Sequence, residues 1–200
     1  LAPLPAVLDA LAMFAERLDE DPVLGPESAA PTDVEALPKS RNVIPDLVVV
    51  ALDWRILPDT TEEDLLDEVR TAVRRRLPTC PEGLSWEVRM ATETQTTYTG
   101  MRRERGLLTP GFLVSADHPA VVAAAEAVGR RNGDGAARVR PWTFATDGGW
   151  TCGVHGIPTF GFAPGEERHA HTSTERLALD EAEWALARYP AMVAAAMESL

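Results

Sequence analysis

The sequence is poor in the residues that several kinds of site require. Its two cysteines, Cys80 and Cys152, lie 72 residues apart and form no CxxC pair. This excludes a disulfide framework and a finger-type zinc site. Isolated cysteines are typical of a reducing compartment, so we expect a cytoplasmic protein. No apolar run approaches the roughly 18 residues that cross a bilayer, which excludes a membrane span and a membrane partner.

Basic residues are scarce in the first third of the chain. Residues 1–68 contain 16 acids and 4 bases, which accounts for the whole net charge of −12. Nucleic-acid binding needs a basic surface, and no region supplies one, so nucleic acid is excluded as a partner. The motifs GxSxG, GxGxxG and the P-loop are also absent. The sequence begins on Leu1 rather than Met and shows no secretory signal. We therefore expect a processed product or part of a longer sequence.

The first half of the chain contains a clear helix and a clear strand. Apolar residues at helical spacing predict a helix over 4–18. Residues 47–57 are β-branched and apolar and then alternate, which predicts a strand. The alternation places Asp53 and Arg55 on one face, and Leu52, Trp54 and Ile56 on the other.

Further elements surround that strand. Thr60 and Glu63 have the spacing of a capping box, which predicts a helix that ends before Pro78. Residues 84–92 alternate as a further strand, and residues 33–37 suggest a short one. This order fits a sheet with two helices on one face. It becomes a split βαβ arrangement if one more strand precedes it.

The second half of the chain predicts a parallel α/β unit. Residues 93–116 have little periodicity and form a connector. A helix is expected over 119–131, a strand over 138–146 and a buried strand over 157–165. A final helix begins at Asp180. Alternating helices and strands are typical of parallel sheets.

Histidines are the best candidates for chemistry, and there are four. His118 precedes a helix and His155 a strand, which indicates structural roles. His169 and His171 follow a predicted strand, where open α/β sheets bind ligands, and Glu175 could orient the second ring nitrogen of a liganding histidine. A polar loop without a ligand is the alternative. Zinc needs three or four protein ligands, so one histidine cannot form the site.

Three segments resemble one enzyme family. They are GIPTFGFAPGEERHAHTSTERLALDE (156–181), SRNVIPDLVVVALDWRILP (40–58) and WTFATDGG (142–149). They resemble the acetylornithine deacetylase, succinyl-diaminopimelate desuccinylase and carboxypeptidase G family of zinc metallopeptidases and amidohydrolases. The likeness covers nearly all of the chain in the right order.

The resemblance implies a fold of the α/β and α+β classes with two domains. Residues 1–110 would be a ferredoxin-like lid, or dimerisation, domain that lacks its first strand. Residues 111–200 would be the C-terminal part of a zinc-peptidase-like α/β catalytic domain. Lid domains of this family pair side by side, so the resemblance implies a homodimer through residues 1–110.

The resemblance also assigns roles to individual residues. His171 matches the last metal ligand, with Glu175 behind it, and the cofactor would be two zinc ions, with cobalt or manganese as alternatives. The remaining ligands and the general base are expected upstream of Leu1. The matches to substrate-binding positions are Asn42, Arg55, Thr146, Asp147 and Gly148. Asn42 would act across the dimer, and Arg55 would bind a substrate carboxylate. A plain salt bridge with Asp53 is the alternative for Arg55.

One position departs from the family pattern. Many members have an arginine after the 146–148 turn, where this chain has Gly149 and Trp150, so the usual amino-acid substrate is in question. We expect part of a metal-dependent hydrolase that cleaves an amide or peptide bond of an N-acyl amino acid, small peptide or ureido compound. The 200 residues alone are expected to be inactive. The alternative is a non-catalytic dimerisation module or the remnant of a truncated gene.

Overall fold

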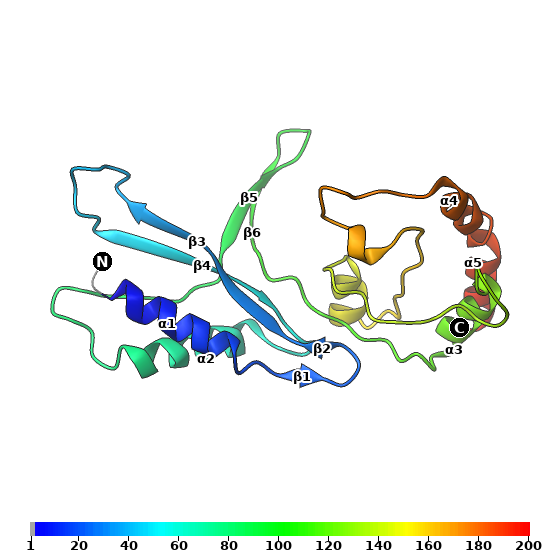
Figure 1. The fold of residues 1–200 in the computed structure, drawn as a ribbon, viewed down its shortest axis with the longest axis horizontal. Helices are drawn as coiled ribbons and strands as arrows, with labels where there is room; N and C mark the ends of the chain where they lie inside the picture. Colours follow the sequence, from blue (N-terminus) through cyan, green and yellow to red (C-terminus); the bar gives the residue numbers. More distant parts are fainter. Residues whose placement is uncertain (1–2) are drawn as a thin grey trace. The chain divides into compact units, whose positions relative to one another are not determined.

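The computed structural model describes residues 3–200, which form two units. The first unit ends at Phe112 and the second begins at Leu113. These bounds lie two residues beyond the boundary expected from the sequence. The elements of the first unit are α1 (Leu4–Ala15), β1 (Glu20–Asp21), β2 (Gly25–Pro26), β3 (Ser28–Leu37), β4 (Leu47–Arg55), α2 (Glu62–Arg76), β5 (Thr92–Thr96) and β6 (Arg102–Gly106) (Figure 1).

The β3–β4 hairpin is the main sheet of the first unit. Its strands are antiparallel, with Ser28 opposite Arg55 and Leu37 opposite Leu47. Side chains along β4 alternate between exposed and half-buried over all nine residues, as its sequence predicts. β3 is longer than the expected 33–37 strand, because β4 offers it a partner along its whole length.

Helices α1 and α2 pack against each other beside the hairpin, and α1 also contacts β3 (Figure 1). The rings of Phe14 and Trp54 meet edge to face, with their centroids 4.8 Å apart. Trp54 therefore lies on the helix side of β4, as predicted, and Arg55 lies on the opposite face. The mixture of small sheets and helices confirms the predicted mixed α/β class.

The cap of α2 lies one residue later than predicted. Thr61, not Thr60, is the N-cap: its hydroxyl accepts from the Asp64 main-chain N–H, and the Asp64 carboxylate accepts from the Thr61 N–H. The Thr60 hydroxyl instead donates to the Leu57 carbonyl oxygen. Asp can replace Glu in a capping box because its shorter carboxylate still reaches the N-cap N–H.

The strand predicted over 84–92 is wrong in its bounds. The structure assigns β5 to Thr92–Thr96, which pairs with β6. Residues 84–90 alternate in burial, but no described strand pairs with them. Two of their contacts are with α2: Arg70 donates to the Val88 carbonyl oxygen at 3.1 Å, and Arg74 lies over the Trp86 ring at 6.0 Å. The alternation in burial over residues 84–90 therefore results from packing, not from pairing in a sheet.

The second unit is helical in the part of the chain that the structure describes. Its elements are α3 (Pro119–Val128), a π-helix (Gly149–Val154), a 3-10 turn (Glu167–His169), α4 (Leu179–Leu186) and α5 (Tyr189–Glu198). The core consists of Ala124, Val128 and Met192, with Phe160, Phe162, Trp184 and Tyr189 packed around it. His118 caps α3 by accepting from the Ala120 N–H, which fits its predicted structural role.

The two strands predicted for the second unit are wrong. Residues 138–146 and 157–165 form no sheet, and Ile157 is 57% exposed. A strand needs a neighbour for its backbone groups, and none of the described residues of this unit offers one. The final helix is divided into α4 and α5, because Pro190 cannot continue the hydrogen-bond ladder of α4. No described helix is long and apolar enough to span a membrane.

Candidate functional site

The residues predicted to bind substrate or metal fall into two groups, one in each unit. Asn42 and Arg55 belong to the β3–β4 hairpin of the first unit. The turn 146–148, His171 and Glu175 belong to the second unit.

Asn42 and Arg55 lie at opposite ends of the hairpin. Asn42 is exposed in the loop that joins Leu37 to Leu47, whereas Arg55 is the last residue of β4. Eight residue steps along the strand separate Leu47 from Arg55, which corresponds to about 26 Å. One copy of the chain therefore cannot bring these two side chains to the same small substrate.

The end of β4 that carries Arg55 is held by Glu27. Its carboxylate accepts from the Trp54 indole N–H at 3.2 Å and from the Leu57 main-chain N–H at 2.8 Å. These contacts hold the Trp54 side chain before Arg55 and the Leu57 backbone after it, and the Arg55 side chain is on the exposed face. A guanidinium in such a position suits a carboxylate, because its planar fork donates two parallel hydrogen bonds.

The turn at 146–148 leads directly into the π-helix. The Thr146 hydroxyl accepts from the Gly148 N–H at 3.2 Å, and the Asp147 carbonyl oxygen accepts from Trp150 at 3.0 Å. Thr146 and Asp147 are exposed, and Gly148 is buried. The turn therefore presents one hydroxyl and one carboxylate to solvent.

His171 is held in an uncommon backbone conformation. Its φ is 58°, in the left-handed region, which costs a non-glycine residue about 1 kcal/mol or more. The Glu175 carboxylate accepts from the His171 main-chain N–H at 2.9 Å and so helps hold this conformation. The described contact of Glu175 is with the main chain, and its role behind the ring stays a prediction. Outliers of this kind often occur at functional sites.

Contacts bring the His171 loop to the segment before the turn. The rings of Phe144 and His171 lie 4.8 Å apart. Thr143 donates to Glu167 from its main-chain N–H and its hydroxyl, and Arg140 lies 3.7 Å from the same carboxylate. The hydrogen bonds from Thr143 lower the pKa of Glu167 below its ordinary value of 4.5, and Arg140 adds to this effect.

Sequence reasoning missed Phe144 and Glu167 as positioning residues. The sequence predicts a strand over 138–146, which includes Phe144, and gives Glu167 no role. Phe144 contacts His171, and Glu167 accepts from Thr143, across more than 20 residues of the sequence. A local sequence pattern does not predict contacts over that separation. The structure thus brings the His171 loop into contact with Thr143 and Phe144, which precede the 146–148 turn.

The described residues do not form a metal site. No group of three or more His, Cys, Asp or Glu side chains among them could hold a metal ion. His169 is half-buried, with its Nε2 3.9 Å from a Glu166 oxygen and without a hydrogen bond. Because zinc requires three or four protein ligands, residues 3–200 alone do not fit a zinc ion.

The α1-to-α2 part of the first unit corresponds to a known domain. Residues 5–79 match the family model described as the peptidase dimerisation domain. This match supports the M20 peptidase family, a group of metallopeptidase-type hydrolases. The residues that match this model thus include the β3–β4 hairpin, with both Asn42 and Arg55. The match ends before β5 and β6.

Two curated relatives are similar over most of the chain. The "Uncharacterized protein YgeY" of Escherichia coli strain K12 and that of Escherichia coli O157:H7 are each 31% identical over 170 residues. The alignment covers 85% of this chain and 40% of each relative. This chain therefore spans about 40% of the length of the curated relatives it matches.

Proposed function

We propose that this chain is part of a homodimeric, metal-dependent amidohydrolase of the cytoplasm. The substrate class is an N-acyl amino acid, a small peptide or a ureido compound, whose amide bond is cleaved. The observation that carries the proposal is the match of residues 5–79 to the peptidase dimerisation domain. The strained His171, in contact with Phe144 beside the 146–148 turn, gives it independent support.

Within this proposal each unit has a separate task. In the second unit, His171 would be one metal ligand, and Thr146, Asp147 and Gly148 would line the substrate. When bound, the ion, zinc or alternatively cobalt or manganese, would activate the water that attacks the amide bond. The other ligands and the general base would come from outside the 200 residues, since the described residues supply no metal cluster.

In the first unit, Arg55 would bind the substrate carboxylate. Asn42 would act on the substrate bound by the other copy. The separation of about 26 Å along β4 supports this division, because it prevents both side chains of one copy from acting on one molecule. The dimer is then needed for activity as well as for assembly.

The full-length protein tests the proposal. Purified with zinc, it should contain metal and hydrolyse a panel of N-acetyl amino acids, dipeptides and ureido acids. His171→Ala should lose metal and activity, whereas His169→Ala, two residues away, should keep the metal. A full-length protein that dimerises but contains no metal and hydrolyses nothing would contradict the proposal and favour a non-catalytic dimerisation module.

A further inference from the structure

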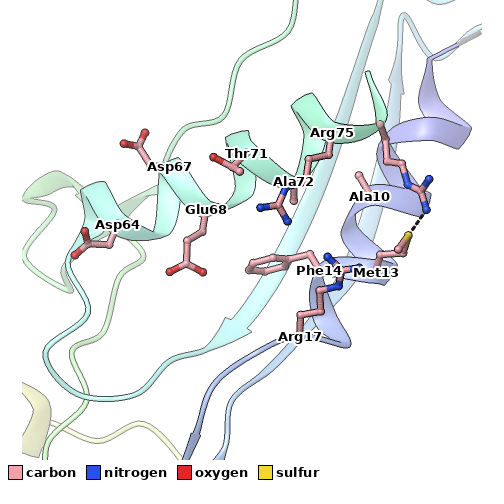
Figure 2. A pocket seen from close by; sticks show the side chains of 11 residues that line it. Ala10, Met13, Phe14, Arg17, Asp64, Asp67, Glu68, Thr71, Ala72 and Arg75 are labelled. Carbon is pink, nitrogen blue, oxygen red and sulfur yellow. Dashed lines mark hydrogen bonds between the residues drawn. The ribbon is translucent and has the colours of Figure 1, made fainter. Parts of the chain in front are cut away.

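Two features of residues 3–200 could receive another molecule. The first is a groove of about 580 Å³ between α1 and α2, lined by residues that include Phe14, Glu68 and Arg75 (Figure 2). This groove lies within the residues that match the dimerisation domain, so the proposed homodimer accounts for it. The second feature is a group of aromatic side chains in the second unit, to which the proposed function assigns no ligand.

These side chains form one continuous aromatic surface, which consists of the rings of Trp142, Phe144 and His171. The ring centroids of Trp142 and Phe144 lie 5.4 Å apart at an interplanar angle of 57°. Those of Phe144 and His171 lie 4.8 Å apart at 56°. Both distances are within the range of about 4.5–7 Å that is typical of attractive aromatic pairs. Phe144 therefore joins the other two rings.

The aromatic surface is open to solvent at both ends. Trp142 is 51% exposed and His171 is exposed, whereas Phe144 between them is half-buried. A large aromatic side chain contributes about 150–250 Å² of contact area when it is covered. Trp142 leaves half of its surface in water. Several adjoining exposed apolar groups, in contrast to a single one, are typical of a binding site.

Hydrogen bonds hold the aromatic surface in place at both ends. Thr143, which stands between the first two rings in the chain, donates to Glu167 from its main-chain N–H at 3.1 Å and from its hydroxyl. The main-chain N–H of His171 donates to the Glu175 carboxylate at 2.9 Å. Because the rings are fixed before a ligand arrives, binding costs little conformational freedom.

Polar groups follow the aromatic surface in the chain. Thr146, two residues after Phe144, begins the turn that presents a hydroxyl and the Asp147 carboxylate to solvent. Small-molecule sites usually combine aromatic walls with a few polar groups of this kind. The Glu167 carboxylate, which is bonded to Thr143, is compensated by Arg140 at 3.7 Å. This compensation favours a neutral aromatic ring over a cation as the ligand.

We propose that the rings of Trp142, Phe144 and His171 bind an aromatic ring of the substrate. The inference rests on the proposed function and narrows its substrate class to compounds with an aromatic group beside the amide bond. An aromatic ligand extends the series of tilted rings and gains the attraction of aromatic pairs in addition to the burial of apolar area. An aliphatic ligand gains only the burial.

Fluorine NMR of the full-length protein tests binding separately from hydrolysis. The protein is labelled with fluorotryptophan and kept in a chelator, and the Trp142 signal is assigned by its loss in Trp142→Phe. N-acetylphenylalanine or N-benzoylalanine, which place the ring on either side of the amide, should shift that signal. By calorimetry, N-acetylcyclohexylalanine, which has a saturated ring, should bind about threefold to tenfold more weakly than N-acetylphenylalanine.

Two leucine variants form a matched pair. Trp142→Leu should lose the preference for the aromatic ligand, and Trp142→Phe, which keeps a ring, should retain part of it. Trp150→Leu is the control and should keep the preference. Trp150 is 46% exposed in the same unit, but it makes no ring contact with the residues that the structure describes. The ligand comparison in the wild-type protein needs no variant, so it decides the question if Trp142→Leu does not fold.

The outcomes separate this inference from the proposed function. Hydrolysis of N-acyl amino acids without a preference for an aromatic ring would overturn the inference and leave the proposed function intact. Aromatic binding that depends on Trp142, in a protein that hydrolyses nothing, would support the inference and contradict the proposed function.

Two further results would overturn the inference by assigning the aromatic surface to something else. A Trp142 signal that no ligand shifts would show that another part of the protein covers the ring. A signal that Nα-acetyllysine shifts as strongly as N-acetylphenylalanine does would show that the surface binds cations, because aromatic faces also attract ammonium groups.

Discussion

Thr143 donates two hydrogen bonds to one carboxylate oxygen of Glu167, from its main-chain N–H at 3.1 Å and from its hydroxyl. The bonds join the segment before the 146–148 turn to the loop that carries His171. Phe144, the next residue, makes the ring contact with His171. The position of the loop that carries His171 thus depends on contacts made by Thr143, Phe144 and Glu167.

Replacing Thr143 by Val should raise the pKa of Glu167 toward its ordinary value of 4.5, because valine lacks the hydroxyl that donates to the Glu167 carboxylate. A lowered pKa in the folded state stabilises the protein above the ordinary value and ceases to do so as pH falls through the folded pKa. The difference in unfolding free energy between wild type and Thr143→Val should therefore be largest near pH 7. It should shrink below about pH 4.5. Urea unfolding from pH 7 to pH 3 measures it, and a difference independent of pH would contradict this assignment.

The corrected cap of α2 predicts different effects for two neighbouring threonines. Thr61→Ala should lower the unfolding free energy by about 1 kcal/mol, because it leaves the Asp64 N–H without its cap. Thr60→Ala removes one bond to the Leu57 carbonyl oxygen and should cost less. Urea unfolding of the two variants compares them. A larger loss in Thr60→Ala would restore the register first predicted from the sequence.

Arg55 should matter for catalysis and little for stability. In the full-length enzyme, loss of its charge-assisted contact with substrate, worth roughly 2–3 kcal/mol, should lower kcat/KM about 30- to 150-fold in Arg55→Ala. Arg55→Lys should recover little of this, because an ammonium lacks the planar fork. Thermal melting is the control. If both variants melt many degrees lower while the folded enzyme keeps its kcat/KM, Arg55 is only a structural partner.

The 200-residue chain should bind zinc weakly. Among residues 3–200 no three candidate ligands lie together, and His171 by itself offers one nitrogen where zinc takes three or four protein ligands. Calorimetric titration should give no tight stoichiometric binding. Tight binding that His171→Ala abolishes would show that the ligand set lies within this chain after all.

The elements that the sequence predicted well are those whose partners are close in the chain. The alternation of β4 was correct because the hairpin partner β3 lies directly before it. Helix α2 was correct because its capping residues and its last-turn arginines Arg74, Arg75 and Arg76 are local signals. The strand predicted over 157–165 is wrong because an apolar run does not distinguish a strand from an irregular segment, and only a distant neighbour decides between them.

The site shows the same limit. The sequence pointed to His171 and Arg55 through motif resemblance, and their roles stay predictions. The contacts that position them, Glu27 with Trp54 and Thr143 with Glu167, join residues 27 and 24 positions apart. Such pairs follow from how the chain packs, which a periodic pattern in one segment does not encode.

Sedimentation equilibrium of the 200-residue chain, over a wide concentration range and a series of salt concentrations, tests the central claim most directly. The dimerisation domain predicts that the mass rises with concentration to twice the 21.7 kDa of the chain. A mass that stays at 21.7 kDa at the highest concentration and at every salt concentration would contradict the account.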